Sequence, residues 1–345
     1  MKSSMKKLSF LLFGLVLLLA ACGGGGDNAS QSTTTEGNKE NGTTEETKKF
    51  KIGVTQIVEH PSLNAAYQGF QDALKDAGLE VEYDYQNALG DNSLNTQIAQ
   101  NLASAGVDLI FANSTPSAQA AKNVTSDIPI IFTSVTDPVE AQLIDSIEAP
   151  GANVTGTIDL HPDVIQTTVE FMKNELGVES IGMVYNAGEP NSVAQVNQVK
   201  AVAEPLGMKV EGATVSQSSE ITQAAESLLG KVDAFYIITD NTVVSALESV
   251  IQVANDNKLP LVVGELDSVR RGGLLAFGFE YYDIGYQAGE MAAKILKGEA
   301  TPADIPAEYP ESLNLVINKD TAEHLGLEVK DEWEAELVET QQAEN

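Results

Sequence analysis

The stretch VDLIFANST, residues 107–115, returns in altered form as VDAFYIITD, residues 232–240. Each copy is a short apolar run, rich in β-branched and aromatic residues, that ends in small polar residues. Runs of this kind are typical of strands buried on both faces of a parallel sheet, and the polar residues predict where each strand ends. The chain therefore contains two copies of one central strand.

The segments around this strand repeat in the same order. In the first half they are KIGVTQ (51–56), GLEVEYDYQ (78–86) and IPIIFTSVTD (128–137), and in the second half IGMVYN (181–186), GMKVEGATV (207–215) and LPLVVGELDS (259–268). The offset between the halves stays between 125 and 131 residues. A repeated order with nearly constant spacing is better explained by two similar lobes than by the common rhythm of α/β proteins.

Helical spacing of apolar residues fills the gaps between the strands. It is found in residues 62–77, 94–105 and 117–125, and again in residues 286–297. Strand–helix alternation with short links indicates βαβ units and a parallel sheet. The sequence thus predicts an α/β fold of two doubly wound parallel-sheet lobes, with SLNLVINKD (312–320) as a late strand.

The first 21 residues have the composition of a secretory signal peptide, with three lysines before an apolar run of 14 residues. Such a run is too short to cross a hydrocarbon core of ~30 Å, which needs roughly 20 residues. The order Leu-Ala-Ala-Cys that ends at Cys22 resembles the lipobox of bacterial lipoproteins, in which cleavage leaves a lipidated N-terminal cysteine. The alternative is a plain signal peptide with an incidental cysteine.

The chain after Cys22 divides at composition changes and glycine-rich links. Residues 22–48 contain no Val, Ile, Leu or Phe, so we expect a flexible tether that holds the body at the extracytoplasmic face of the cell membrane. GANVTG (151–156) is the expected first crossing between the lobes, and residues 278–282 are a second expected hinge. Lobe 1 is expected from residues 49–155 and 280–310, lobe 2 from residues 156–279 and 311–330, and an acidic tail from residues 331–345.

Charge and motif content exclude several classes of function. The formal net charge is −30, and a body this acidic repels nucleic acid and anionic lipid headgroups, so nucleic-acid binding is not expected. The sequence has no HExxH motif, no GxSxG elbow and no P-loop. We therefore expect no enzyme activity, no metal site and no cofactor.

The residues that follow the predicted strands are short, polar and mixed in charge. In open parallel sheets, ligands bind beyond the carboxyl ends of the strands. Thr115-Pro116 fits the start of a helix, where free N–H groups and the helix dipole attract a carboxylate. Asp137, Asp240 and Glu265 can receive an ammonium group. This combination predicts a site for a zwitterion such as a free amino acid, although the same residue types also cap helices that bind nothing.

Six segments of the body resemble one known family. They are VEHPSLNAAYQGFQDAL, NSTPSAQA, IIFTSVTDPVEAQL, YNAGEPNSVAQ, ITDNTVVSALE and YYDIGYQAG. In these segments the chain resembles the substrate-binding lipoproteins of bacterial ABC importers, and most closely the tryptophan/tyrosine binding proteins. The resemblance implies a periplasmic-binding-protein type I (Venus-flytrap) fold with three inter-lobe crossings, which closes on an aromatic or related amino acid and presents it to a membrane permease.

The resemblance also implies a set of cleft residues. Carried over by position, the ligand-binding candidates are His60, Asn113, Thr115, Ser134, Asp137, Asn186, Glu189, Asn191, Asp240, Asn241, Glu265 and Tyr281. Family members often carry an aspartate where this chain has Glu265, a difference of one methylene group. We expect a monomeric amino-acid-binding lipoprotein; a sugar or nucleoside binder of the same fold is the alternative, and a sensor role is not separable from transport.

Overall fold

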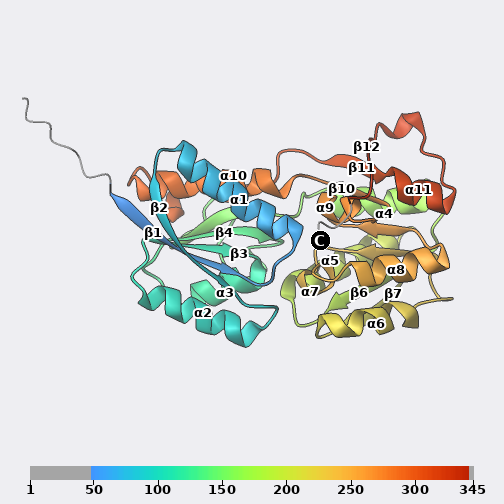
Figure 1. Cartoon of the computed structure of the whole chain (residues 1–345), viewed down its shortest axis with the longest axis horizontal. Helices are drawn as coiled ribbons and strands as arrows, with labels where there is room; N and C mark the ends of the chain where they lie inside the picture. Colours follow the sequence, from blue (N-terminus) through green and yellow to red (C-terminus); the bar gives the residue numbers. More distant parts are fainter. Residues whose placement is uncertain (1–47, 342–345) are drawn as a thin grey trace, which may run out of the picture. The chain divides into compact units, whose positions relative to one another are not determined.

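The computed structural model describes residues 48–341, which form two α/β lobes (Figure 1). The sheet of lobe 1 consists of β1 (Lys49–Gln56), β2 (Glu80–Asn87), β3 (Leu109–Asn113), β4 (Ile130–Val135) and β5 (Val154–Ile158). All neighbouring strands are parallel, in the order β2-β1-β3-β4-β5. The parallel sheet expected for the first half is confirmed.

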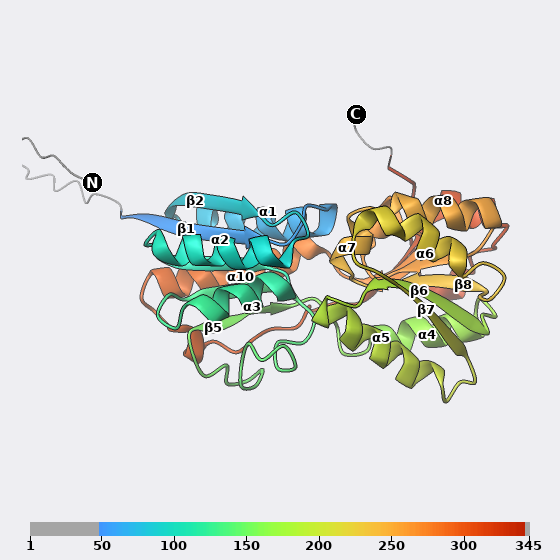
Figure 2. The same cartoon turned by 90° about the horizontal axis from the view of Figure 1, so that it is seen from below.

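Helices cover both faces of this sheet (Figures 1 and 2). They are α1 (Pro61–Asp76), α2 (Asn92–Ser104), α3 (Thr115–Val124) and, from late in the chain, α10 (Tyr281–Leu296). In β3, Leu109 and Phe111 pack in the cluster that holds α1 and α10, and Ile110 and Ala112 pack with α3 on the other face. The strand is buried on both faces, as its continuous apolar sequence predicts.

Lobe 2 contains a larger sheet. Its strands are β6 (Ser180–Asn186), β7 (Lys209–Val215), β8 (Ala234–Ile237), β9 (Leu261–Val263), β10 (Leu275–Gly278), β11 (Asn314–Asn318) and β12 (Glu336–Val338). The order is β12-β11-β10-β9-β8-β6-β7, and the β10–β11 pair is antiparallel. The part β7-β6-β8-β9-β10 has the same order as the whole sheet of lobe 1, which accounts for the repeat in the sequence.

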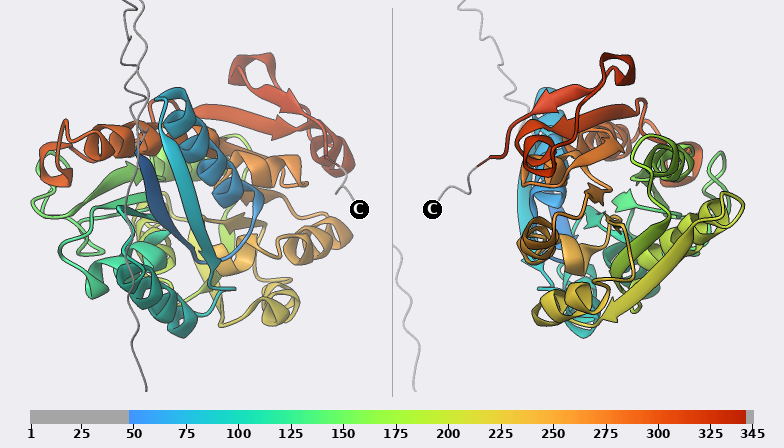
Figure 3. Two further views of the ribbon diagram at one scale, coloured as in Figure 1. Left: turned by 60° about the vertical axis from the view of Figure 1, so that its left-hand side comes forward. Right: turned by 90° about the vertical axis from the view of Figure 1, so that its right-hand side faces the viewer.

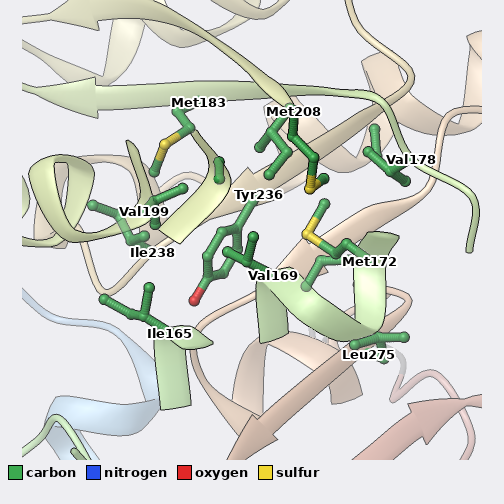
Figure 4. Close-up of a cluster of buried hydrophobic side chains, with 14 of the residues drawn as sticks. Ile165, Val169, Met172, Val178, Met183, Val199, Met208, Tyr236, Ile238 and Leu275 are labelled. Carbon is green, nitrogen blue, oxygen red and sulfur yellow. The ribbon is translucent and has the colours of Figure 1, made fainter. Parts of the chain in front are cut away.

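Helices also cover both faces of the second sheet. They are α4 (Val164–Asn174), α5 (Pro190–Ala203), α6 (Ile221–Ser227), α7 (Asn241–Val244), α8 (Glu248–Asn257), α9 (Leu266–Arg270) and α11 (Lys319–Leu325), with 3₁₀ turns η1 (Ser218–Glu220), η2 (Pro302–Asp304) and η3 (Asp331–Trp333). On the face covered by α4 and α5, the ring of Tyr236 lies among Val169, Met172 and Met183 (Figure 4). No helix within residues 48–341 combines the length and apolar composition needed to span a bilayer.

The chain passes between the lobes three times: after β5, after β10 and before β11. The first crossing lies later than expected, because residues 151–156 lead into β5 instead of leaving the sheet. Strand β5 pairs with β4 through Phe132 opposite Gly156 and Val135 opposite Ile158. Gly156 is needed inside the sheet, since a Cβ atom there would lie 1.9 Å from the carbonyl oxygen of Phe132. The boundary expected after residue 155 therefore moves to Ile158.

The expected acidic tail is corrected over residues 331–341, which belong to lobe 2. Strand β12 pairs in parallel with β11 along the edge of the sheet (Figure 3). The ring of Trp333 packs against Phe171 with a centroid distance of 5.0 Å, and its Nε1 donates to Glu175 at 2.9 Å. The acidic composition of residues 331–341 does not predict a strand. Their backbone nevertheless pairs with β11 and extends the sheet. The expected signal peptide, Cys22, nearly all of the tether and residues 342–345 lie outside the described residues.

Helices α1 and α10 approach each other closely although they lie far apart in the sequence (Figure 1). A Cβ atom at Gly285 of α10 would lie 1.9 Å from the carbonyl oxygen of Ala66, and one at Gly69 of α1 would lie 2.1 Å from that of Tyr282. Glycine at these positions lets the two backbones touch. This contact attaches the helix that follows the second crossing to lobe 1.

We predict that Gly285→Ala destabilises the protein. Alanine favours a helix by about 1 kcal/mol over glycine, but overpacking typically costs ~1–3 kcal/mol and here requires the helices to separate. Urea unfolding should show a lower midpoint, whereas Glu290→Ala, at an exposed position of the same helix, should leave the midpoint almost unchanged. Equal or higher stability of Gly285→Ala would contradict the close contact.

Candidate ligand-binding site

Buried polar atoms without hydrogen-bond partners gather at the carboxyl ends of the strands. Within residues 48–341 six buried side-chain atoms have no partner, and five of them belong to ligand-binding candidates. They are His60 Nδ1, Asn113 Oδ1, Thr115 Oγ1, Ser134 Oγ and Asn191 Oδ1. A buried polar group without a partner costs ~1–3 kcal/mol, so this concentration indicates a site that a polar ligand completes.

Two serines beside these atoms have a strained backbone. Ser114 has φ 112° and Ser134 has φ 57°, values that residues with a side chain rarely adopt. The N–H of Ser114 donates to the carbonyl oxygen of Thr133 at 3.1 Å, which ties the end of β3 to β4. Strain of this kind persists mainly at functional sites, where the surrounding structure holds it.

Asn113 is held in place by its amide nitrogen. Nδ2 donates to Gln56 Oε1 at 3.0 Å and to the carbonyl oxygen of Leu63 at 2.8 Å. These two bonds fix the side chain between β1 and α1, and they leave Oδ1 as the atom without a partner. The end of β3 therefore offers an acceptor with a fixed direction.

His60 is an uncharged group in this site. It precedes α1, is 5% exposed, and Nδ1 lacks a partner. Burial, followed by the charge of Arg271, lowers its pKa to about 3. At neutral pH the ring is therefore a neutral donor or acceptor, and the side chain of Asn241 lies close to it.

Glu189 and Asp240 are occupied within lobe 2. The carboxylate of Glu189 accepts from the backbone and side chains of Asn241 and Thr242 at the start of α7. Asp240 accepts from the N–H groups of Asn186 (2.6 Å) and Val243 (2.8 Å) and from Ser192 Oγ (2.7 Å). Burial, and then the charge of Glu189, raises the pKa of Asp240. The ammonium contact expected for Asp240 competes with this internal network.

Asp137 lies at the rim of a pocket between the lobes. Its Oδ1 accepts from the N–H groups of Val139 at 3.0 Å and Glu140 at 2.8 Å. The pocket has a volume of about 280 Å³. It is lined by Thr115, Asp137, Glu140 and Ala141 of lobe 1 and by Ala187, Gly188, Pro190, Asn191, Val193 and Ala194 of lobe 2. Two of the atoms without partners, on Thr115 and Asn191, thus belong to residues that face the same pocket.

Asp159 and Glu265, like Glu189 and Asp240, are buried carboxyl groups without an ion-pair partner among the described residues. Asp159, directly after β5, accepts from Tyr281 OH at 2.9 Å and Thr136 Oγ1 at 3.2 Å, and burial raises its pKa to about 6. Glu265, before α9, accepts from Ser62 Oγ at 2.7 Å, and burial raises its pKa to about 8. At pH 7 Asp159 is mainly ionised and Glu265 mainly protonated.

Direct hydrogen bonds join the lobes. Ser62, on α1, bonds Glu265, at the start of α9. Gln195 Nε2, on α5, donates to Thr136 Oγ1 of lobe 1 at 3.2 Å and to Thr239 Oγ1 of its own lobe at 2.6 Å. The lobes therefore lie in a closed arrangement, with Glu265 only 2% exposed.

The structure brings most of the candidates together and adds further residues to them. Asp159, Ser62, Thr136, Gln195 and Thr239 were not among the candidates, yet all are buried at the facing ends of the lobes. Asp159 follows β5 as the other candidates follow their strands, so recognition of VTGTI as a strand would have revealed it. Within residues 48–341 no group of three His, Cys, Asp or Glu side chains is placed to hold a metal ion.

Fold and cleft together define a two-lobed solute-binding protein. The family model of the ABC transporter substrate binding protein matches residues 51–341, and the chain belongs to this family. Its members bind solutes for transport and are not enzymes.

Relatives with known names or structures agree with this class. The chain is 41% identical to a tyrosine-binding protein of Clostridioides difficile (strain R20291) over 296 residues, which cover 84% of this chain and 85% of the relative. An ABC domain of Streptococcus pneumoniae in complex with L-tryptophan matches with 35% identity and a TM-score of 0.80, over 84% of this chain and all of that chain. The ligand-free, open structure of a substrate-binding protein with adhesive properties from Clostridium difficile is 40% identical, with a TM-score of 0.64 over 85% of this chain and all of that chain. The fold thus matches the tryptophan complex better than the open structure.

We predict that Asp240→Ala destabilises lobe 2 by about 3 kcal/mol, because it leaves two N–H groups and one buried hydroxyl without their acceptor. Urea unfolding of the ligand-free protein measures the loss, and Asp240→Asn, which keeps one acceptor oxygen, should recover part of it. An unchanged unfolding midpoint for Asp240→Ala, together with lost ligand affinity, would instead make Asp240 a direct ligand contact.

Proposed function

We propose that this protein captures a free aromatic L-amino acid, tryptophan or tyrosine, between its lobes and delivers it to an ABC permease. The observation that carries the proposal is the set of five buried polar atoms without partners, contributed by both lobes at the ends of their strands. The names of the relatives support the choice of an aromatic amino acid.

The ligand carboxylate would lie at the polar end of lobe 1. Thr115 and Ser134 offer hydroxyl donors beside the N-terminus of α3, where the helix dipole favours an anion. His60 adds a neutral ring that can donate without a competing charge. Within residues 48–341 the atoms without partners at this end of the cleft belong to uncharged side chains, which do not repel an anion.

The ligand ammonium group would pair with Asp159. This carboxyl is buried, mainly ionised at pH 7, and its side-chain donors are two hydroxyl groups. A cation beside it would compensate the cost of burying its charge. Asp159 is a better partner than Asp240, whose oxygens already accept from three groups of lobe 2.

The aromatic ring would occupy the pocket between the lobes. Thr115 and Asn191 line this pocket, and each has a buried polar atom without a hydrogen-bond partner. A ligand that bonds to these atoms would therefore contact the wall of the pocket. Ala141, Ala187 and Pro190 give that wall an apolar surface for a flat ring. Asn186, Glu189, Asp240 and Asn241 would support the wall from behind through the network that caps α7.

A screen of ligands tests the proposed function. Purified full-length protein is titrated calorimetrically with amino acids, sugars and nucleosides, and its melting temperature is followed in parallel. L-Tryptophan or L-tyrosine should bind and, at a hundred times its dissociation constant, add ~2.7 kcal/mol of stability. Stabilisation by sugars or nucleosides alone would overturn the proposal in favour of the other solutes that this fold serves.

We predict that Asp159→Asn weakens binding of the amino acid more than tenfold, since a hydrogen bond to a charged group contributes ~1.5–3 kcal/mol. The substitution should not weaken binding of 3-(4-hydroxyphenyl)propionate, a tyrosine analogue without the ammonium group. Asp163→Asn, whose side chain is 77% exposed, is the control and should bind as the unaltered protein does. Equal losses for tyrosine and its analogue would show that Asp159 does not hold the ammonium group.

We also propose that lipidation of Cys22 anchors the protein to the outer face of the cell membrane, with residues 23–48 as the tether and the protein as a monomer. Cys22→Ala should abolish incorporation of labelled palmitate and release the protein from the membrane fraction. Incorporation that survives this substitution would place the lipid elsewhere and contradict the anchor.

A further inference from the structure

We propose that the lobes close through a protonated Glu265, so that closure on the ligand takes up one proton from solution. The inference rests on the proposed function, since ligand binding is what drives the closure. It makes Glu265 a positioning residue between the lobes rather than the partner of the ligand's ammonium group.

Glu265 is a buried acid at the contact between the lobes, only 2% exposed. Ser62 Oγ, from α1 of lobe 1, donates to Oε2 at 2.7 Å, and Ser268 Oγ, from α9, donates to the same atom at 3.2 Å. Both hydroxyl groups donate to Oε2, which leaves Oε1 to carry a proton. The bond from Ser62 by itself lowers the pKa of the carboxyl, and burial outweighs it. Ser62 belongs to lobe 1 and Glu265 to lobe 2, so this bond exists only when the lobes meet.

The charged groups around Glu265 do not favour its ionised form. Asp267 on its own helix and Asp159 after β5 both raise the pKa of the carboxyl, while Arg271 lowers it. Arg271 is already held by Glu248 and by the carbonyl oxygen of Val244. Two further groups stay neutral: His60 of lobe 1, and Tyr281 of α10, whose own pKa is raised by burial. Burial is the largest influence and brings the pKa of Glu265 to about 8.

Opening the lobes changes this environment. Separation of α1 from α9 removes Ser62 and exposes the carboxyl to water, where its pKa returns toward the ordinary value of about 4.3. Between that value and 8 the closed form binds one more proton than the open form. Closure is therefore favoured as the pH falls through this range, and the advantage is lost as the pH rises to 8.

Neighbouring acids do not produce the same effect above pH 6.5. Asp159 titrates lower, with a pKa near 6, and a bound ammonium group would lower it further. The hydrogen bonds of Asp240 lie within lobe 2, so opening does not break them. Of these three acids, Glu265 is the one with a hydrogen bond from one lobe to the other.

The test measures the affinity of the full-length protein for L-tryptophan and for L-tyrosine at two pH values, about 6.5 and about 8.5. For each amino acid, linkage predicts a roughly twentyfold weaker affinity at the higher pH. Calorimetry near pH 7 in two buffers with different ionisation enthalpies should show uptake of about one proton. Glu265→Gln keeps an oxygen acceptor for Ser62 but cannot titrate. In this variant the proton uptake and the pH dependence of the affinity should both disappear. At pH 8.5, where the unaltered protein binds weakly, Glu265→Gln should therefore bind the amino acid more tightly than the unaltered protein does.

Matched variants and outcomes separate this inference from the proposed function. Glu82→Gln, an exposed acid paired with Lys49 in lobe 1, should retain the pH dependence of the unaltered protein. Equal affinity at both pH values, or a more than tenfold loss at both pH values in Glu265→Gln, would overturn the inference and leave the proposed function standing. Failure of both amino acids to bind at either pH would overturn the proposed function and the inference with it.

Discussion

Buried polar groups must find hydrogen-bond partners, and this constraint shapes the facing ends of both lobes. Every strand of a parallel sheet ends at the same edge as its parallel neighbours, so the polar residues that terminate the strands are brought together. In lobe 2 they satisfy one another, because Glu189 and Asp240 accept the N–H and hydroxyl groups at the start of α7. In lobe 1 Asn113, Thr115 and Ser134 keep atoms without partners. The same architecture thus leaves most of the partnerless atoms in lobe 1, while in lobe 2 only Asn191 of the binding candidates keeps one.

The acids near the crossings connect the cleft to the segments that join the lobes. Helix α9 begins beside Glu265, which bonds Ser62 of lobe 1, and it ends at Arg270, which pairs with Glu280 at the start of α10. One short helix therefore links the bond between the lobes to the second crossing. Asp159 lies at the first crossing and accepts from Tyr281 at the second. The cleft is in this way directly connected to two of the three crossings between the lobes.

Much of the fold was readable from local patterns. The apolar runs of β3 and β8 predicted strands buried on both faces, and the repeated order of segments predicted the shared strand order of the two sheets. Other elements were hidden. The glycine in β5 suggested a link between the lobes, but it is needed because the backbone of Phe132 lies so close. The charge of residues 331–341 suggested a tail, but backbone pairing with β11 makes them part of the sheet. Backbone contacts between distant segments leave little trace in composition.

The sequence by itself determined that there are two similar parallel-sheet lobes with polar strand ends, because strand burial and strand termination are local properties of residue type. It also supplied the acids from which an ammonium site could be made. Only the tertiary structure decided which acids are occupied and which are not, because that depends on hydrogen bonds between residues far apart in the chain. Ser192 bonds Asp240 across 48 residues and Tyr281 bonds Asp159 across 122, and no local pattern encodes either pairing.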